Sequence, residues 1–179
     1  MPLANTTKDL LSKHYGGLQG PEDESYEVAV ALAGLFKLNG VTKPGVIAVC
    51  YSRAKYWYVA VSPDLQKNIK TIAGAYGVTK WLHKVTQFAV KKAGYSFESG
   101  IYACTTTLKD ISKYPNPGCA EKKIVSALHT YGDDILQLSL YGFPNSDDEA
   151  VLRSYVAVGD QYGSYLTPCS SCLTVANIY

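Results

Sequence analysis

The spacing of apolar residues along the chain predicts five helices. Acidic residues precede the first apolar run, as is typical of a first helical turn, and Ser62-Pro63-Asp64 has the composition of a helix start. In the third helix, Leu82, Val85, Phe88 and Ala89 form an apolar stripe with helical period. The predicted helices cover residues 23–38, 63–76, 79–93, 119–131 and 169–177.

Short runs rich in β-branched and aromatic residues predict strands between these helices. The runs 46–51 and 56–62 flank the polar turn 52–55, which is typical of an antiparallel hairpin. Further strands are expected at 101–105, 135–141 and 152–158. Because strands and helices alternate, the pattern predicts an α/β domain with two or three layers.

Composition limits the chain to one folded unit. It has 179 residues and 19.4 kDa, with 47% hydrophobic and 18% charged residues, enough for a real core. No apolar run approaches the roughly 20 residues of a membrane span, and no secretory leader is visible. We therefore expect one domain over 1–179, with 1–20 as a flexible lead-in and no membrane partner. The expected location is the cytoplasm.

The net charge of +2 hides an uneven distribution. Residues 51–123 carry 12 basic and 4 acidic side chains, whereas residues 124–179 carry 1 basic and 6 acidic ones. A basic middle third favours a polyanionic partner such as nucleic acid. A lysine-rich face that only contacts solvent is the alternative, and it gains weight because only 2 of the 17 basic residues are Arg.

Two short motifs carry candidate chemistry. Cys119-Ala120-Glu121 follows a Pro/Gly loop at a predicted helix start, and Pro168-Cys169-Ser170-Ser171-Cys172 begins 49 residues after Cys119. Cysteines at i and i+3 can direct two sulfurs at one metal ion, and a third thiolate leaves one position open, as in catalytic zinc sites. Glu121 is then available to accept and return a proton. Buried thiols with a surface glutamate and no metal are the alternative.

These motifs resemble the zinc-dependent cytidine deaminase superfamily, with its x-A-E and P-C-x-x-C signature. The resemblance implies that Cys119, Cys169 and Cys172 bind one Zn²⁺ and that Glu121 carries protons while the cytosine C4 amine is replaced by oxygen. It implies a central mixed β-sheet flanked by helices in α/β/α layers. It also places Tyr51, Ser52, Arg53, Ala120 and Trp81 among candidate substrate contacts.

The chain departs from the nucleoside-salvage members of that superfamily. Ser170-Ser171 and Leu173-Thr174 replace their P-C-G-x-C-R-Q pattern, and the asparagine that holds ribose has no obvious counterpart. A basic helical insertion over 63–99 separates the hairpin from the x-A-E helix. Its lysines alternate with Tyr76, Trp81, Phe88 and Tyr95, which suits phosphate neutralisation and base stacking. Core packing of Trp81 and Phe88 is the competing interpretation.

The sequence therefore favours hydrolytic deamination of cytosine to uracil in DNA. Compact deaminases with such insertions resemble toxin domains of bacterial competition systems, which implies delivery into a target cell and an immunity protein as a partner. Deamination of free cytidine, a nucleotide or a nucleoside antibiotic is the first alternative. A zinc-containing binding module without turnover is the second.

Overall fold

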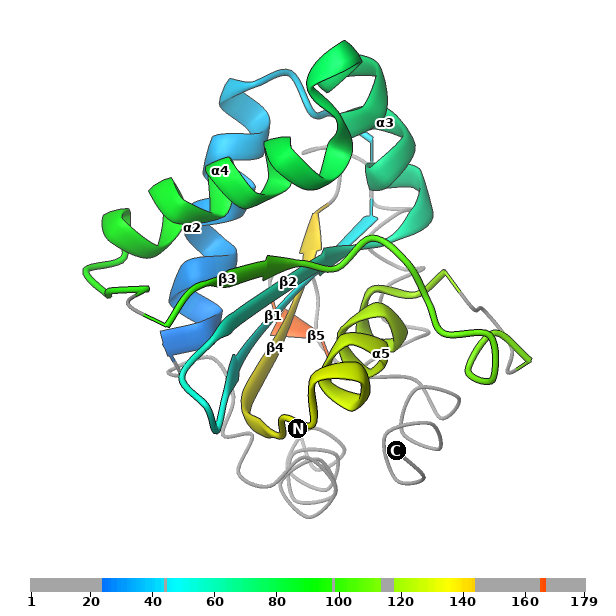
Figure 1. Cartoon of the computed structure of the whole chain (residues 1–179). Coiled ribbons are helices and arrows are strands. Elements are labelled where there is room, and N and C mark those ends of the chain that lie inside the picture. Colours follow the sequence, from blue (N-terminus) through cyan, green and yellow to red (C-terminus); the bar gives the residue numbers. More distant parts are fainter. Residues whose placement is uncertain (1–23, 44, 98, 114–117, 144–164, 167–179) are drawn as a thin grey trace, which may run out of the picture.

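The computed structural model describes residues 24–43, 45–97, 99–113, 118–143 and 165–166. Its centre is a five-stranded sheet with the order β3-β2-β1-β4-β5 (Figure 1). The strands are β1 (Gly45–Ser52), β2 (Trp57–Val61), β3 (Ile101–Ala103), β4 (Ile135–Phe143) and β5 (Tyr165–Leu166). The sheet is mixed, because β3 is parallel to β2 while the other neighbours are antiparallel.

Strand β1 holds the sheet together because it pairs along its length on both sides. Ala48 faces Ala60 of β2 and Leu140 of β4 in the two antiparallel ladders. The predicted hairpin between β1 and β2 is confirmed. Ser62 extends this ladder: its N–H donates to the Val46 carbonyl, and its hydroxyl accepts the Val46 N–H at 2.9 Å.

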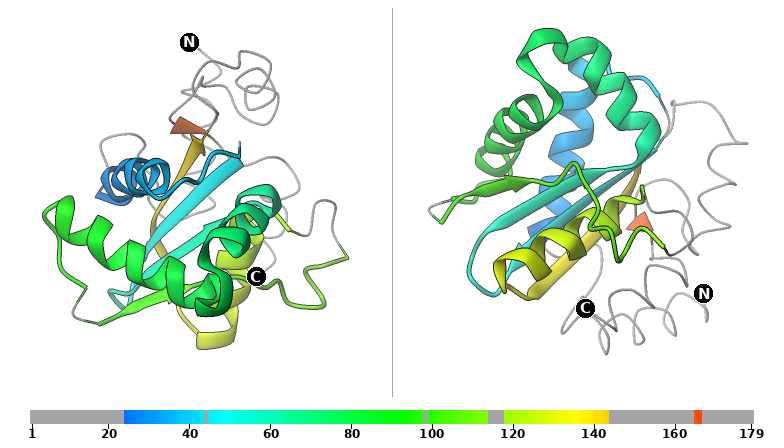
Figure 2. Two further views of the ribbon diagram at one scale, coloured as in Figure 1. Left: turned by 90° about the horizontal axis from the view of Figure 1, so that it is seen from above. Right: turned by 45° about the vertical axis from the view of Figure 1, so that its right-hand side comes forward.

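Both faces of the sheet are covered, which gives three layers (Figure 2). One face carries α2 (Glu24–Leu38), α3 (Pro63–Ala73), the 3-10 helix η1 (Gly74–Tyr76) and α4 (Val78–Lys92), and the other carries α5 (Ala120–Tyr131). Alternation along β1 divides the two cores: Ile47 and Val49 pack under the first group, and Ala48 and Cys50 pack under α5. The expected α/β class and flanked mixed sheet are therefore confirmed.

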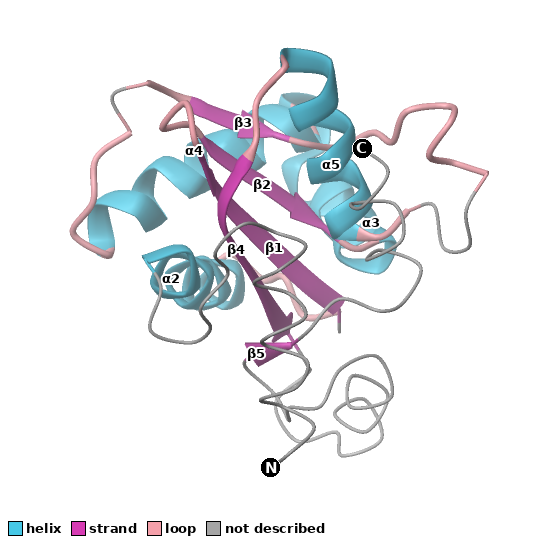
Figure 3. Ribbon diagram, turned by 90° about the horizontal axis from the view of Figure 1, so that it is seen from below, coloured by secondary structure: helices cyan, strands magenta, loops and turns pink. Residues whose placement is uncertain are grey.

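The segment between β2 and β3 is part of the core. It crosses from β2 to the parallel edge strand β3, and a parallel pair needs a long connection of this kind. Leu65 and Ile69 of α3 and Leu82 and Ala89 of α4 are fully buried in the core that contains α2. Each buried leucine or isoleucine contributes about 1.5–3 kcal/mol, so this layer is firmly attached. Figure 3 shows its helices against the sheet.

Of the two interpretations of Phe88, core packing is wrong: its side chain is 56% exposed, while Leu82, Val85 and Ala89 of the same stripe are buried. The predicted helix start at Ser62-Pro63-Asp64 is confirmed, with Ser62 at the N-cap of α3. The Ser62 side chain makes no cap hydrogen bond, and its hydroxyl accepts the Val46 N–H instead.

The predicted strand 152–158 and the predicted helix 169–177 lie outside the described residues. So does the expected lead-in, 1–20. Within the described part of the chain, no helix combines the length and the apolar character that crossing a bilayer requires.

Alanine substitutions at two glycines are expected to change the free energy of unfolding in opposite directions, and they test the packing of α3 on β1. A Cβ at Gly45 would lie 2.5 Å from the Leu65 Cγ, so we expect Gly45→Ala to lower the free energy of unfolding by about 1–3 kcal/mol. Gly34 sits inside α2 with nothing within 4 Å of an added Cβ, so Gly34→Ala should raise it by about 0.5–1 kcal/mol. Urea unfolding of both variants measures these changes. Equal effects of the two substitutions would contradict the packing of α3 on β1.

Candidate functional site

Helix α5 begins against the first turn of α3. Cys119 is its N-cap residue, with extended backbone, and Glu121 lies in its first turn. The preceding residue, Gly118, approaches Pro63 so closely that an added Cβ would lie 2.6 Å from the Pro63 Cγ. The start of the x-A-E motif is therefore fixed in space by the helix that follows the hairpin.

The first turn of α5 is buried although it is charged. Cys119 is half-buried, and Ala120 beneath it is 1% exposed. Glu121 is 6% exposed and Lys123 is 4% exposed. The surface glutamate of the metal-free alternative is thus wrong, because this carboxylate lies inside the protein. Buried charges are costly unless they are paired or have a chemical role, so this turn is a candidate functional site.

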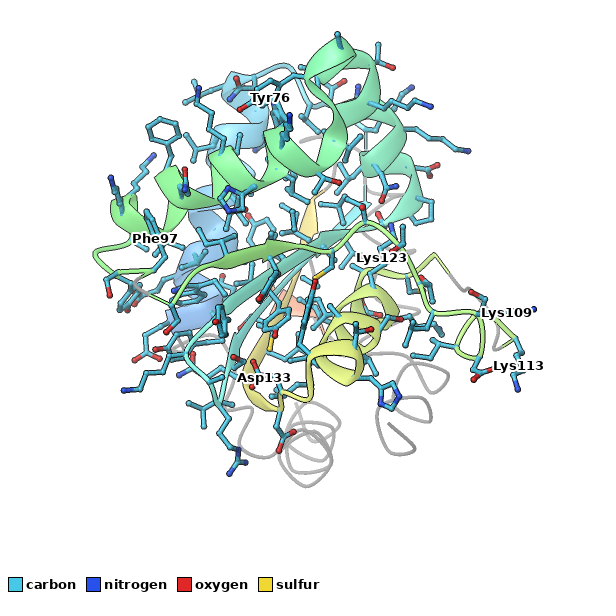
Figure 4. The ribbon with its side chains drawn as sticks, in the orientation of Figure 1. Tyr76, Phe97, Lys109, Lys113, Lys123 and Asp133 are labelled. Carbon is cyan, nitrogen blue, oxygen red and sulfur yellow. The ribbon has the colours of Figure 1, made fainter. Side chains whose placement is uncertain are left out.

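Lys123 connects three elements at this end of the molecule (Figure 4). Its ammonium donates to the Val61 carbonyl at the end of β2, at 2.8 Å, and to the Gln66 Oε1 on α3, at 2.7 Å. The Gln66 amide in turn donates to the Thr105 carbonyl after β3 at 3.4 Å. The C-terminal ends of β2 and β3 therefore meet the start of α5 at one corner of the sheet.

The electrostatics of this corner favour a positive lysine and a neutral neighbouring thiol. Burial lowers the pKa of Lys123 to about 8, and the nearby Cys119, Cys104 and Glu121 oppose that change. Burial raises the pKa of Cys104 to about 12, although a backbone hydrogen bond from Val59 and the charge of Lys123 act in the other direction. At neutral pH, Lys123 is therefore the cation that stabilises negative charge on Cys119 or Glu121.

A groove of about 230 Å³ lies between α5 and the segment that follows β3. Hydroxyl groups line most of it, and Lys123 and Cys104 lie at one part of its wall. The stacked rings of Tyr102 and Tyr131, with centroids 4.5 Å apart, form another part. The hydroxyl-bearing lining residues are Thr105, Thr106, Thr107, Ser126 and Thr130, besides the two tyrosines.

Only one of the three cysteines expected to bind zinc belongs to the described residues. Cys119 offers a thiolate, a ligand type that zinc prefers, at a helix N-terminus whose dipole favours negative charge. Cys169 and Cys172 lie outside the described residues. Among residues 24–43, 45–97, 99–113 and 118–143, no three histidine, cysteine or acidic side chains form a group that could hold a metal ion.

Three expected substrate contacts lie at the other end of α5. Arg53 forms an ion pair with Asp134 at 3.4 Å, with both side chains mostly exposed. Ser52 is buried, and its hydroxyl accepts the Tyr56 N–H at 3.1 Å. Tyr51 packs against Trp57 on the opposite face of the sheet, with ring centroids 4.7 Å apart and the rings tilted by 45°. Because the 12 residues of α5 span about 18 Å, the structure does not bring these residues to Glu121.

Trp81 lies on the face of the sheet that α5 does not cover. Its ring packs on Phe36 with centroids 5.5 Å apart, and it contacts the core beneath α2 and α4. The structure thus places Trp81 in a packing position, apart from Cys119 and Glu121. Cys119, Ala120 and Glu121 lie together at the start of α5 because they are consecutive, and none of the other expected site residues in the described part of the chain joins them.

A scan of protein-family models, a search of curated proteins and a search of solved structures each find no match to the chain.

The sequence did not reveal the parts played by Gln66, Thr105 and Lys123. Lys122 and Lys123 follow Glu121 directly, and a charged run of this kind normally faces solvent, so it gave no signal that the Lys123 ammonium is buried. Gln66 and Thr105 gave no signal either, because only the crossover brings them beside α5.

Replacing Lys123 tests the corner directly. Lys123→Met keeps an unbranched side chain without the terminal ammonium and leaves the Val61 carbonyl and the Gln66 Oε1 without this donor. We expect the free energy of unfolding to fall by about 1–3 kcal/mol, as measured by urea titration. Lys113→Met is the matched control, since that side chain is 71% exposed and should change stability by less than about 0.5 kcal/mol. Equal stability of the two variants would refute the role of Lys123.

Asp133 fixes the other end of α5, and its carboxylate makes the stability of the protein depend on pH. Its carboxylate accepts the Tyr58 hydroxyl at 3.0 Å and the Ala54 N–H at 3.1 Å. Burial alone would raise its pKa, but hydrogen bonds from Ser52, Asp134, Ala54 and Tyr58 outweigh burial and hold the pKa below the ordinary value of 3.8. As the pH falls, the Asp133 carboxylate therefore becomes protonated in the unfolded chain before it does so in the folded protein. The contribution of this carboxylate to folding stability is complete above pH 3.8 and is lost as the pH falls through its folded-state pKa.

We accordingly expect Asp133→Asn to lower stability at pH 7 by about 1–2 kcal/mol. The difference from the wild type should shrink once the pH falls below about 4. Thermal unfolding between pH 2 and pH 7 measures it. Asp110→Asn, at a carboxylate that is 72% exposed, serves as the control. A difference that stays constant with pH would contradict the proposed role of the ionised carboxylate.

Proposed function

We propose that this protein is a zinc-dependent deaminase that hydrolyses cytosine to uracil in DNA. The observation that carries the proposal is the buried side chain of Glu121, two residues from a half-buried Cys119 at the N-terminus of α5. A carboxylate in that position suits proton transfer beside a metal-bound reactant better than it suits solvation. The second motif, Pro168-Cys169-Ser170-Ser171-Cys172, supplies the further thiols in the sequence.

The order of the elements supports the same proposal. A β-hairpin is followed by the helix with the x-A-E motif, and strand β4 then pairs with β1. The resemblance to cytidine deaminases implies this order of hairpin, helix and strand. The crossover through α3, α4 and β3 is an addition that extends the sheet beyond β2.

Each residue near the start of α5 has a separate task in the proposed reaction. Zinc, when bound, would supply the Lewis acidity that makes water a nucleophile near neutral pH. Cys119 would hold it together with Cys169 and Cys172. Glu121 accepts a proton from the attacking water and returns it to the departing amine. Lys123 compensates the negative charge that three thiolates would gather there.

The groove beside α5, of about 230 Å³, is the place proposed for the substrate base, because Lys123 lines it. Cys119 and Glu121 are not among its lining residues, so the base would have to pass Lys123 to reach them. The size of the groove suits one nucleobase with its sugar and leaves the rest of a polynucleotide on the surface. A base held there would have to be single-stranded or extruded from a duplex, as in enzymes that act on bases.

Replacing Glu121 tests the proposed chemistry. We expect Glu121→Gln, which keeps the shape of the buried side chain, to reduce uracil formation in labelled single- and double-stranded DNA by about 10²–10⁴-fold. Zinc content, measured by elemental analysis, should not change. Glu27→Gln on α2 is the control, and it should keep full activity.

Replacing Cys119 tests the proposed metal site in the same assays. Cys119→Ala should lose zinc and activity together, and full zinc retention would remove Cys119 from the metal site. Activity that persists in Glu121→Gln would refute the assigned proton carrier. Free cytidine is assayed in parallel, and turnover of cytidine alone would replace DNA by a free nucleoside as the substrate.

A further inference from the structure

We propose that the outer surface of α4, together with Tyr76, binds the backbone and bases of single-stranded nucleic acid. This surface, the α4 ridge, consists of Tyr76, Lys80, His83, Lys84 and Phe88. The inference rests on the proposed function, because it gives that function a path for the substrate strand. The α4 ridge and α5 lie on opposite faces of the sheet. The ridge would therefore be a second binding region, separate from the corner at Cys119 and Glu121.

The charge of the ridge is positive and uncompensated on its own helix. Helix α4 contains four lysines and no acidic residue. Within the described part of the chain, neither Lys80 nor Lys84 forms an ion pair with a carboxylate. These two lysines stand one helical turn apart, about 6 Å along the axis, a separation that successive phosphates of an extended strand can bridge. Phosphate neutralisation by lysine supplies most of the affinity of sequence-independent binding.

Exposed aromatic rings accompany this charge. Tyr76 is 50% exposed and Phe88 is 56% exposed, although both belong to residue types that normally bury their rings. Two hollows of about 380 and 350 Å³ adjoin the ridge, and Tyr76 and Lys84 line both. Aromatic faces beside lysines are the arrangement that single-stranded nucleic acids use for base stacking. An acidic protein partner would need the lysines but not rings in this exposed position.

The ridge continues toward the candidate functional site. Thr79, which lines the larger hollow, meets Thr105 with 3.2 Å between the hydroxyl oxygens. Thr105 lines the groove beside α5 that also contains Lys123. A strand stacked on Tyr76 can therefore pass over Thr79 and Thr105 and present one base to the groove. Figure 4 shows Tyr76 and Lys123, which mark the two ends of this proposed path of the strand.

Binding of fluorescein-labelled oligo(dT) to the full chain tests the ridge without any chemistry, since oligo(dT) contains no cytosine. We expect fluorescence anisotropy to show affinity that falls steeply with salt. The double variant Lys80→Glu, Lys84→Glu should reduce the slope of log affinity against log salt by about 1.4, the contribution of two phosphate contacts on a single strand. Tyr76→Ala should weaken binding about tenfold at fixed salt, as expected for one stacked base, and Tyr76→Phe should restore it.

The matched control is the double variant Lys109→Glu, Lys113→Glu, which makes the same charge change on the loop away from Tyr76 (Figure 4). Equal loss of affinity in the two double variants would overturn the proposal. So would displacement of oligo(dT) by poly-L-glutamate as effectively as by unlabelled oligonucleotide, which would indicate an acidic protein as the occupant. Ridge-dependent binding without uracil formation from cytosine-containing DNA would instead leave the ridge in place and refute the deaminase.

Discussion

One buried ammonium group determines how the elements of this protein meet. The Lys123 side chain reaches from α5 across to the end of β2 and to Gln66 of α3, and it makes hydrogen bonds of 2.8 and 2.7 Å there. These two hydrogen bonds tie the first turn of α5, which contains Glu121 and follows Cys119, to the end of the hairpin and to α3. The cost of burying this charge appears as the pKa of Lys123, which burial lowers to about 8.

The two faces of the sheet have different tasks. The face under α5 carries the charged first turn, the hydroxyl-lined groove and the stacked tyrosines. The other face packs α2, α3 and α4 into the larger apolar core, in which Trp57 and Phe36 are buried. Helix α4 therefore uses one side for the core and keeps its lysines for the surface. This division explains how a segment with so many lysines also holds the edge strand β3 in place.

The sequence predicted the local elements well because each depends on nearby residues. The hairpin turn after β1, the helix that ends at Gly132 and the strand that begins at Ile135 all follow from periodicity and from turn residues. The expected grouping of Tyr51 and Arg53 with Glu121 did not follow, because it depends on where each end of α5 falls relative to the hairpin. The position of Phe88 was left open between core packing and base stacking, because a stripe of apolar residues with helical period is wider than the part of the helix that contacts the core. Cys119 and Glu121 were proposed from the spacing of their motif, and their role stays a prediction.

The parallel pairing of β3 with β2 has a consequence for how the chain folds. Trp57 is paired with Ile101, and Ala48 with Leu140, so two of the main ladders join residues that are far apart in sequence. Contacts of this kind require closure of long loops before they contribute any stability, which slows folding. Among the described strands, the β1–β2 hairpin is the one ladder between neighbours in sequence, so it needs the shortest loop to close. The corner that brings α5 to β2 depends on closure of the long crossover, and we expect it to form after the hairpin.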